Sequence, residues 1–480
     1  VQKTLTQQRK ELDKAQSRYI LNPDIALRSW RLVPYAYYRK GVRYAKGLKK
    51  EEFEFLLKCD GKTELRGELP LAEKFLDMEF IAPAKNEDSL SEWQKHLDCD
   101  NRYFPAMSWM ITGKCNYNCL HCFNAADNAP IMSEWTLEEA KMLMEQAQKC
   151  GINAITITGG EPMLHKNFFE IVESIYAHGM YLEDLNTNGS FLDQTALEQF
   201  RKIGCNPLIK ISFDGIGHHD WLRNRNGAEA DALRAIRLCV ENGFRVKAQT
   251  NVHRLNIESL LPTAEMLDEM GVDEMRVIRT SESPRWKENA DGSCLEVEEY
   301  YESMLEFADR YIKKKHNMII DIWQFLMVFP RTESYRLRPV EYVAGEYRDS
   351  MPVCRGNRGM IAVAADGNVY PCMQMSGYFS AKNNFLGNVK KEGLQPILQK
   401  GRYLSEVCAT LGQLSENNEK CAVCPYFKHC GGGCRALALA FTGDKFGIDP
   451  AKCLFFQNGW HRKIEETLRG WKNIAPMEGE

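Results

Sequence analysis

Three cysteines near the middle of the chain have the spacing of ligands to a metal cluster. They are Cys115, Cys119 and Cys122 in the segment KCNYNCLHCFN, a C-x3-C-x2-C pattern with no fourth cysteine close by. Thiolates suit iron–sulfur clusters, and a cubane of four irons takes four ligands. Three thiolates would leave one iron open, which is where chemistry can happen. A zinc site completed by His121 is the alternative for this segment.

A glycine-rich turn follows one predicted helix later, in the segment NAITITGGEPMLH at residues 153–165. Its β-branched run predicts a short buried strand. Gly159 and Gly160 carry no Cβ, so their backbone can approach a ligand closely. Glu161 and Pro162 follow, and the proline ends the strand. Taken alone, this segment would be an ordinary turn.

Together, the cysteine triad and the GGEP turn resemble the radical S-adenosylmethionine (radical SAM) superfamily. The resemblance implies a [4Fe–4S] cluster on the three cysteines, with SAM chelating the open iron. It also implies that the GGE segment, Gly159 to Glu161, contacts the amino group of SAM. Cleavage of SAM would give a 5′-deoxyadenosyl radical that abstracts a hydrogen atom from the substrate. That chemistry belongs to the cofactor, and the protein positions it.

Two further strand-like segments continue the resemblance, LEDLNTNGS at 182–190 and LIKISFDG at 208–215. Barrel folds place ligands at the carboxyl ends of their strands. The resemblance assigns SAM contacts to Ser212 and Arg223, and it places Asn188 at the same site. Without it, SFDG would be a turn and Arg223 a surface residue. An adenine pocket is expected at Val277 or Ile278.

The cysteine count points to more metal. The chain has 17 cysteines and is far longer than a small secreted protein, so metal binding explains them better than a disulfide framework. A zinc ribbon is the alternative for the first C-x2-C pair of the C-terminal region. The full C-terminal set resembles the SPASM extension of radical SAM enzymes that modify peptides. Its members are Cys354, Cys372, Cys421, Cys424, Cys430, Cys434 and Cys453.

In that family the seven cysteines divide between two auxiliary [4Fe–4S] clusters, which makes three clusters in all. The resemblance assigns Cys354, Cys372 and Cys434 to the first. It assigns Cys421, Cys424, Cys430 and Cys453 to the second. The first set lacks a fourth thiolate, so its fourth site is either open to substrate or filled by Cys408. Most of the remaining cysteines are expected to be buried apolar residues; they are Cys59, Cys99, Cys150, Cys205, Cys239, Cys294 and Cys408.

Whole-chain properties narrow the class of protein. A chain of 480 residues predicts two to four domains. The net charge of −3, with 26% charged residues, gives no basic surface for nucleic acid. No run of apolar residues is long enough for a membrane span, and the polar N-terminus VQKTLTQQRKELDK is not a signal peptide. Thiolate-held clusters and many free cysteines imply a reducing, anaerobic cytoplasm.

Between residues 107 and 280, strand-like and helix-like runs alternate six times. Such alternation predicts parallel βα units and an α/β fold. The resemblance implies a partial (β/α)6 barrel of the TIM type. We expect a radical SAM domain at 99–345, ending in a helical linker around VEEYYESMLEFADRYIKKKH. A cysteine-rich SPASM domain would then occupy 346–480.

Residues 1–98 precede the barrel and predict a separate domain. RSWRLVPYAYYRK predicts a strand pair, and KEEFEFLLKCDGKTELRGE predicts a helix, a turn at Asp60–Gly61 and the start of another helix. This pattern resembles the winged-helix-like RiPP recognition element, which captures the leader of a ribosomally made precursor peptide by strand addition. A helical cap without a partner is the alternative.

The favoured function is a radical SAM maturase that modifies a ribosomally synthesised precursor peptide, with a thioether or carbon–carbon crosslink as the favoured modification. Its partners would be the precursor with its leader and an electron donor such as a flavodoxin or ferredoxin. An anaerobic sulfatase maturase that oxidises Cys or Ser is the alternative. Those relatives carry an aspartate where this chain has Met373. A non-catalytic iron–sulfur electron-transfer or sensor protein would leave GGEP, NTNG and SFDG without a role. No catalytic residue of the chain itself is assigned.

Overall fold

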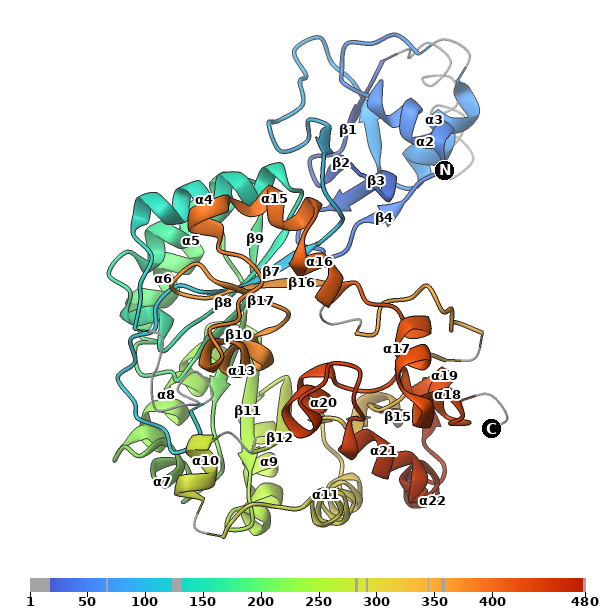
Figure 1. The fold of residues 1–480 in the computed structure, drawn as a ribbon. Coiled ribbons are helices and arrows are strands. Elements are labelled where there is room, and N and C mark those ends of the chain that lie inside the picture. Colours follow the sequence, from blue (N-terminus) through green and yellow to red (C-terminus); the bar gives the residue numbers. More distant parts are fainter. Residues whose placement is uncertain are drawn as a thin grey trace, which may run out of the picture.

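The computed structural model describes residues 18–65, 68–122, 132–280, 284–290, 292–343, 345–354 and 359–477. The polar N-terminal segment VQKTLTQQRKELDK lies outside these residues. Figure 1 shows a small N-terminal domain, a central barrel and a C-terminal region of short helices beside the barrel. No helix in the described ranges is long and apolar enough to cross a membrane.

The central barrel is built on parallel strands that follow one another in sequence order. Six strands between residues 106 and 279 pair as neighbours, which confirms the expected βα units and the partial barrel. A seventh strand, β13, continues the parallel run beside β12. The strands are β7 (Ala106–Met110), β8 (Ala154–Thr158), β9 (Tyr181–Thr187), β10 (Leu208–Ser212), β11 (Val246–Val252), β12 (Glu274–Arg279) and β13 (Ile319–Ile322).

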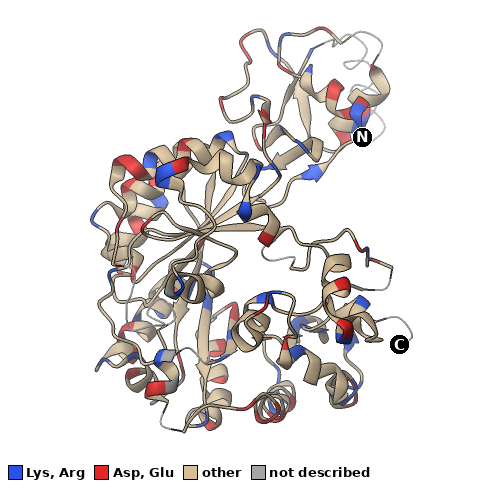
Figure 2. Cartoon of the chain, viewed as in Figure 1, with Lys and Arg blue, Asp and Glu red and all other residues tan. Residues whose placement is uncertain are grey.

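Helices cover the outer face of this sheet (Figure 1). Local signals fix their ends: Thr136 and Glu139 form a capping box before α4, and Gly204 takes the left-handed conformation after α6. Basic and acidic residues are interspersed along these helices (Figure 2). The helices are α4 (Leu137–Lys149), η2 (Pro162–Leu164), α5 (Phe168–Ala177), α6 (Gln194–Ile203), α7 (His219–Arg223), α8 (Ala228–Glu241), η3 (Ile257–Ser259), α9 (Leu260–Glu269), α10 (Pro284–Asn289) and α11 (Val297–Ile312).

The C-terminal region extends the barrel sheet on both sides. Strand β16 pairs in parallel with β7, while β14 and β15 form an antiparallel hairpin beyond β13. The added strands are β14 (Leu326–Phe329), β15 (Ser334–Leu337), β16 (Met360–Val363), β17 (Val369–Tyr370) and β18 (Lys472–Asn473). The helices of this region are η4 (Pro330–Thr332), η5 (Met373–Met375), α13 (Ser376–Ala381), α14 (Val389–Glu392), α15 (Leu394–Gln399), α16 (Arg402–Val407), α17 (Leu411–Asn417), α18 (Glu419–Ala422), α19 (Phe427–Cys430), α20 (Arg435–Thr442), α21 (Pro450–Gln457) and α22 (Trp460–Thr467).

One hydrophobic core runs through the barrel and the C-terminal region, from Phe104 to Met477. The indole of Trp135, just before α4, donates to the carbonyl of Ala364 at 3.2 Å, which links the two regions directly. Apolar burial of this extent holds the C-terminal region rigidly against the barrel. Five of the seven cysteines outside the expected cluster sets are buried, which confirms their expected structural role.

The N-terminal domain has its own core and its own sheets. Strands β1 (Tyr19–Leu21) and β5 (Ile81–Pro83) pair with each other. A four-stranded sheet has the order β4-β3-β2-β6, so β4 and β6 are its edges. The expected strand pair and the two helices are confirmed. Its further elements are β2 (Ile25–Trp30), β3 (Val33–Arg39), β4 (Lys46–Gly47), β6 (Leu97–Cys99), α2 (Lys50–Leu57) and α3 (Leu69–Asp77).

This domain docks on the turn between α4 and β8. The indole of Trp30 donates to the carbonyl of Cys150 at 3.1 Å, and the Tyr38 hydroxyl donates to the carbonyl of Gly151 at 3.0 Å. Gly151 has a φ of +71°, and a Cβ there would lie 2.6 Å from the indole nitrogen. The docking therefore needs glycine at this turn both for its conformation and for space.

Candidate functional site

The cysteine triad lies on the loop that follows β7. Cys115 is exposed, while Cys119 and Cys122 are half-buried. Although Cys115 as a whole residue is exposed, desolvation of its thiol raises the pKa to about 12, with contributions from the nearby Cys119 and Cys122 thiols. The structure thus brings the three sulfurs into one electrostatic neighbourhood. The donor set fits an iron–sulfur cluster held at three irons.

The described residues contain no group of three or more His, Cys, Asp and Glu side chains that converges on a single metal ion. A cubane needs a wider arrangement, because each cysteine binds a different iron of the cluster. His121, the residue considered for a zinc site, is buried with its ring edge-on to Trp286 at 6.4 Å.

The GGEP turn packs directly on the triad loop. The Gly160 amide donates to the carbonyl of Thr112, and the Glu161 amide donates to the carbonyl of Lys114, both at 2.8 Å. A Cβ on Gly160 would lie 2.2 Å from the Lys114 carbonyl oxygen, and one on Gly159 would lie 2.5 Å from that of Thr112. The sequence suggested that these glycines leave room for a ligand. The structure shows that they also leave room for the triad loop.

Glu161 is fully buried and joins two strand ends. One carboxylate oxygen accepts from the Asn188 amide at 2.8 Å, and the other accepts from the Thr187 hydroxyl at 2.8 Å and the Met163 amide at 3.2 Å. Burial raises the pKa of this carboxyl to about 7, although these donors oppose the shift. Its carboxylate fixes the NTNG loop in place relative to the GGEP turn.

Asn188 in turn reaches the triad loop. Its side-chain nitrogen, Nδ2, donates to the side-chain oxygen of Asn116 at 2.8 Å. The Ser190 hydroxyl donates to the Tyr117 hydroxyl at 2.8 Å, and Arg225 stacks 4.7 Å above the Tyr117 ring. Asn116, Tyr117, Ser190 and Arg225 were missed in the sequence. Only the position of the first two between cluster cysteines could have drawn attention to them.

The SFDG segment and Arg223 form an ion pair beside the triad. Arg223 donates from Nε to Asp214 Oδ2 at 2.6 Å and from Nη2 to Asp214 Oδ1 at 3.1 Å. Its third nitrogen lies 3.9 Å from the sulfur of Cys119. Burial would raise the pKa of Asp214, but Arg223 and His219 hold it well below the usual value. Asp214 is therefore a buried anion that orients Arg223 toward the triad loop.

Ser212 and the two candidate adenine contacts lie on neighbouring strand ends. The Ser212 hydroxyl is half-buried and has no side-chain partner among the residues described, so it is available to a ligand. Val277 is fully buried in the shared core. Ile278 is half-buried on the other face of β12, since side chains alternate along a strand. Of the two candidates, Ile278 is therefore the one placed toward the inside of the barrel.

The C-terminal cysteines form two neighbourhoods. In one of them, burial raises the pKa of the Cys372 thiol, and the nearby Cys434 and Cys354 thiols add to this effect. These three cysteines also line one cavity of about 380 Å³ between the barrel and the C-terminal region. Cys408 lies at the end of α16. Burial raises the pKa of the Tyr403 hydroxyl on the same helix, and the Cys408 and Cys372 thiols add to this effect.

The second neighbourhood contains Cys421, Cys424, Cys430 and Cys453. Burial raises the pKa of Cys453 to about 12, and the other three thiols raise it further. The Gly431–Gly433 run has positive φ throughout and separates Cys430 from Cys434. It thereby directs consecutive cysteines to different sets. Asp449 fixes the position of Cys434, because its carboxylate accepts a hydrogen bond from the Cys434 backbone amide at 2.7 Å.

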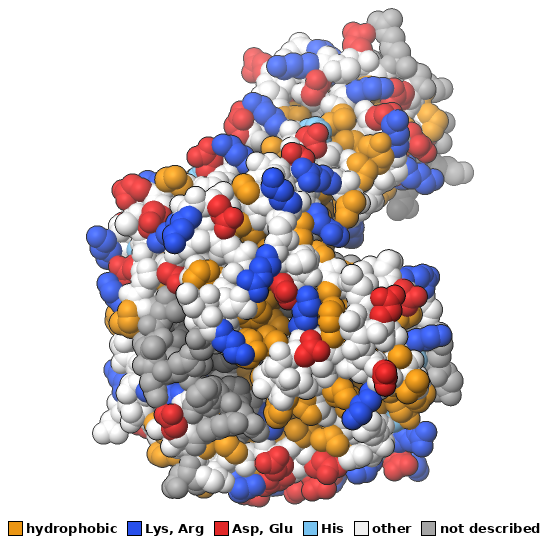
Figure 3. All heavy atoms as spheres, viewed as in Figure 1, with side chains coloured by type: hydrophobic (Ala, Val, Ile, Leu, Met, Phe, Trp, Pro, Cys, Tyr) orange, Lys and Arg blue, Asp and Glu red, His pale blue; other side chains and the backbone are white. Residues whose placement is uncertain are grey.

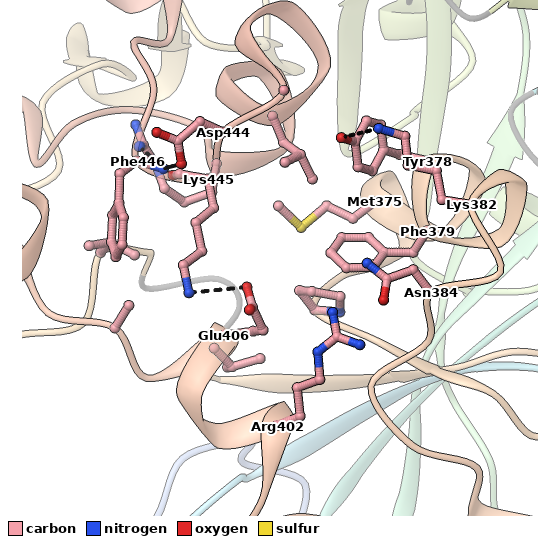
Figure 4. A pocket seen from close by; sticks show the side chains of 17 residues that line it. Met375, Tyr378, Phe379, Lys382, Asn384, Arg402, Glu406, Asp444, Lys445 and Phe446 are labelled. Atoms are coloured by element: carbon pink, nitrogen blue, oxygen red, sulfur yellow. Dashed lines mark hydrogen bonds and ion pairs between the residues drawn. The ribbon is translucent and has the colours of Figure 1, made fainter. Parts of the chain in front are cut away.

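A second cavity, of about 340 Å³, lies behind the first auxiliary set. Figure 3 shows a hollow with a hydrophobic floor on this face, between α13, α16 and α20. In Figure 4, Met375 and Phe379 lie on one side, and the ion pair of Lys445 with Glu406 (3.3 Å) lies on another. Val353, next to Cys354 in the chain, lines both cavities.

Comparison with known proteins identifies the class. The model of the radical SAM superfamily matches residues 109–267, and that of the SPASM iron–sulfur cluster-binding domain matches residues 354–425. The fold and the triad define a radical SAM protein. More particularly, the chain contains a radical SAM domain followed by a SPASM domain and is a radical SAM/SPASM enzyme. Its cofactors are SAM and iron–sulfur clusters.

Three relatives illustrate the range of this class. An AdoMet-dependent heme synthase from Methanosarcina barkeri is 27% identical over 72% of this chain and 95% of its own length. A PqqA peptide cyclase from Granulibacter bethesdensis is 24% identical over 76% of this chain and 91% of its own. The crystal structure of Streptococcus suis SuiB bound to precursor peptide SuiA superimposes with a TM-score of 0.66 at 14% identity. It covers 91% of this chain and 99% of SuiB.

Proposed function

We propose that this enzyme modifies a ribosomally synthesised precursor peptide, forming a thioether or carbon–carbon crosslink. The observation that carries the proposal is the extent of the match to SuiB, a protein crystallised with its precursor peptide. That match takes in 91% of this chain. The match to the heme synthase covers 95% of that enzyme but only 72% of this chain. This chain therefore contains additional residues that the heme synthase does not match. The additional domain favours a peptide substrate over a tetrapyrrole.

The triad of Cys115, Cys119 and Cys122 would hold the cluster that binds SAM. Gly159, Gly160, Glu161, Asn188, Ser212 and Arg223 would surround SAM. The first five lie at the carboxyl ends of β8, β9 and β10, and Arg223 on α7 is paired with Asp214 just after β10, which supports this assignment. When bound and reduced, the cluster and SAM supply a 5′-deoxyadenosyl radical. The chain's own residues hold the triad loop against the strand ends and leave Ser212 and Arg223 facing the ligand.

Two auxiliary [4Fe–4S] clusters complete the proposed inventory of three. Cys354, Cys372 and Cys434 would hold the first, and the four cysteines of the second neighbourhood would hold the other. Their separation in space supports the division. A flavodoxin or ferredoxin is the proposed electron donor.

The N-terminal domain, proposed to span 1–98, would capture the leader peptide. Strand β4 is an exposed edge of the four-stranded sheet, and both its residues, Lys46 and Gly47, are exposed. An extended peptide can add to such an edge by main-chain hydrogen bonds. Val42 and Tyr44, next to this edge, are 40% and 54% exposed and offer apolar contacts. The radical SAM and SPASM domains would then span 99–345 and 346–480.

The identity of the bond depends on the first auxiliary set. If its fourth site is open, a substrate thiol could bind there as a thiolate, which favours a thioether. In that case Cys408→Ala keeps the auxiliary cluster, and cysteines of the precursor are essential. Loss of the cluster in Cys408→Ala, measured by iron content and electron paramagnetic resonance (EPR), would favour a carbon–carbon crosslink. The sulfatase-maturase alternative is disfavoured because Met373 replaces the aspartate those enzymes use.

The test starts with a search for a short open reading frame beside the gene of this enzyme, whose product serves as the candidate precursor. Full-length enzyme, SAM and reductant are incubated anaerobically with the precursor, with its core alone, or with core and leader as separate peptides. We expect the intact precursor to lose two hydrogen atoms and the core alone to react far more slowly. A chain lacking residues 1–95 should still cleave SAM without modifying the precursor. Equal turnover of precursor by the truncated chain would show that the N-terminal domain is a passive cap.

A further inference from the structure

The cavity beside the first auxiliary set also contains groups that can recognise a substrate. It lies where the barrel meets the C-terminal region, with Ser108 and Trp323 on the barrel side and the three cysteines on the other. A peptide segment in this cavity would contact both the barrel residues and the three cysteines. Four cationic side chains line the same cavity: Arg336, Arg338, Arg435 and Lys452.

Three of these cations are already engaged by the protein. Arg338 forms an ion pair with Asp321, with Nε 3.2 Å from Oδ1, and Lys452 donates to Glu341 at 3.0 Å. Arg435 donates to the backbone carbonyls at 445 and 447, at 2.9 and 3.0 Å. The charges of these three side chains are neutralised, or their hydrogen bonds are satisfied, without a ligand.

Arg336 differs from them. It lies on β15 between Tyr335 and Leu337, which are buried in the core, so the alternation of the strand turns Arg336 toward the cavity. Its side chain is half-buried and has no hydrogen bond or ion pair with any residue that the structure describes. A guanidinium stays protonated and has five donors, so a half-buried one that no described residue engages leaves its donors free for the acceptors of a ligand.

We propose that Arg336 binds a carboxylate of the peptide segment lying in this cavity. The carboxylate is an Asp or Glu side chain, or the C-terminus of the peptide. The proposal rests on the proposed function for its peptide substrate. The planar fork of an arginine matches a carboxylate through two parallel hydrogen bonds. Trp323 forms the adjoining wall, held by Arg276 and Arg338 over its ring at 5.1 and 5.6 Å.

A competing role for Arg336 is to balance the negative charge of a cluster on the three cysteines. The two roles make different predictions. Charge balance predicts that removing the cation shifts the midpoint potential of the auxiliary cluster and leaves the KM for peptide unchanged. Carboxylate recognition predicts the reverse. Arg331 provides a matched control, because it is exposed on η4 of the same hairpin and is not among the cavity-lining residues.

The first experiment needs no precursor and therefore tests the site independently of the proposed function. The reconstituted wild-type enzyme is labelled with phenylglyoxal, and the modified arginines are quantified by mass spectrometry. N-acetyl-glutamate methylamide is added as a carboxylate probe, and N-acetyl-glutamine methylamide serves as its neutral isostere. We expect the glutamate probe alone to slow labelling of Arg336, with Arg331 unaffected. Equal protection by both probes, or none by either, would overturn the proposal.

The second experiment compares Arg336→Gln and Arg331→Gln on the precursor that wild-type enzyme modifies. Loss of one charged hydrogen-bonding partner should raise KM by about tenfold to a hundredfold in Arg336→Gln. The kcat, uncoupled SAM cleavage and auxiliary-cluster EPR spectrum should stay close to wild type. The source of the carboxylate is found by replacing acidic precursor residues by their amides or by amidating the precursor's C-terminus. The change that removes the bound carboxylate should abolish the KM difference between Arg336→Gln and Arg331→Gln. An unchanged KM with a shifted potential would assign Arg336 to charge balance instead.

Discussion

At the scale of single residues, the two glycines of the GGEP turn have a defined steric role. Gly160→Ala would place a Cβ 2.2 Å from the Lys114 carbonyl, which is backbone and cannot rotate away. We expect the triad loop to shift, so that iron at the triad and SAM cleavage fall while the auxiliary clusters remain. Overpacking of this kind costs about 1–3 kcal/mol, so the fold should survive. Iron content, EPR and 5′-deoxyadenosine yield measure the outcome.

Gly47→Ala is the matched control for this substitution. Gly47 has an ordinary φ, and the nearest atom to its added Cβ is the Tyr35 carbonyl oxygen at 4.0 Å. SAM cleavage by this variant should equal that of wild type. If Gly160→Ala and Gly47→Ala behave alike, the close packing of the turn on the triad loop is unimportant for the cofactor.

Glu161→Gln tests whether the buried carboxylate positions the NTNG loop. A side-chain amide cannot accept on both sides, so either the Asn188 amide or the Thr187 hydroxyl loses its acceptor. An unsatisfied buried donor costs about 1–3 kcal/mol. We therefore expect weaker SAM binding and a lower melting temperature. Glu170→Gln, at an exposed position of α5, should change neither, and wild-type SAM affinity in Glu161→Gln would contradict the positioning role.

Residue types and spacing were enough to predict which residues lie together at the cysteine triad and which form the C-terminal cysteine sets. Thiolates and strand-end motifs are rare in combination, so together they are informative. They were not enough for the supporting residues. Asn116, Tyr117 and Arg225 are common types whose roles depend on contacts across the fold. Arg336 has no partner among the described residues because other cations of the cavity pair with the nearby acidic side chains. No sequence pattern predicts these pairings.

At the scale of elements, the contact between the N-terminal domain and the barrel depends on the turn after α4. Gly151→Ala would add strain at a positive φ and a clash with the indole of Trp30. We expect it to weaken docking and to slow modification of leader-bearing precursor while uncoupled SAM cleavage persists. The rate ratio of precursor modification to SAM cleavage is the measurement.

Gly243→Ala controls for the backbone strain alone. Gly243 has a φ of +75° after α8, and nothing lies within 4 Å of its added Cβ. Its ratio of peptide modification to SAM cleavage should match that of wild type. A ratio equally lowered in both variants would show that backbone strain, rather than domain docking, is responsible.

The βα elements of the barrel were predictable because each carries its own local signals, such as the capping box at Thr136 and the glycine after α6. Pairings distant in sequence were not. Strand β16 joins β7 across some 250 residues. This pairing has no local signal, because hydrophobic burial against the shared core selects it.

At the scale of the whole molecule, the proposed three clusters predict about twelve iron atoms per fully reconstituted chain. The triple change of Cys115, Cys119 and Cys122 to Ala should remove about four of them and abolish SAM cleavage. The two auxiliary clusters should remain, because their cysteines lie in separate neighbourhoods of the C-terminal region. Iron analysis that finds a single cluster in the wild type would contradict this inventory.

The most direct test of the central claim follows a hydrogen atom from the peptide to the cofactor. Precursor peptide with deuterated side chains is incubated anaerobically with the reduced enzyme and SAM. We expect deuterium in 5′-deoxyadenosine and a peptide that has lost two hydrogen atoms. Formation of 5′-deoxyadenosine free of deuterium, with the peptide unchanged and a tetrapyrrole modified in its place, would contradict it.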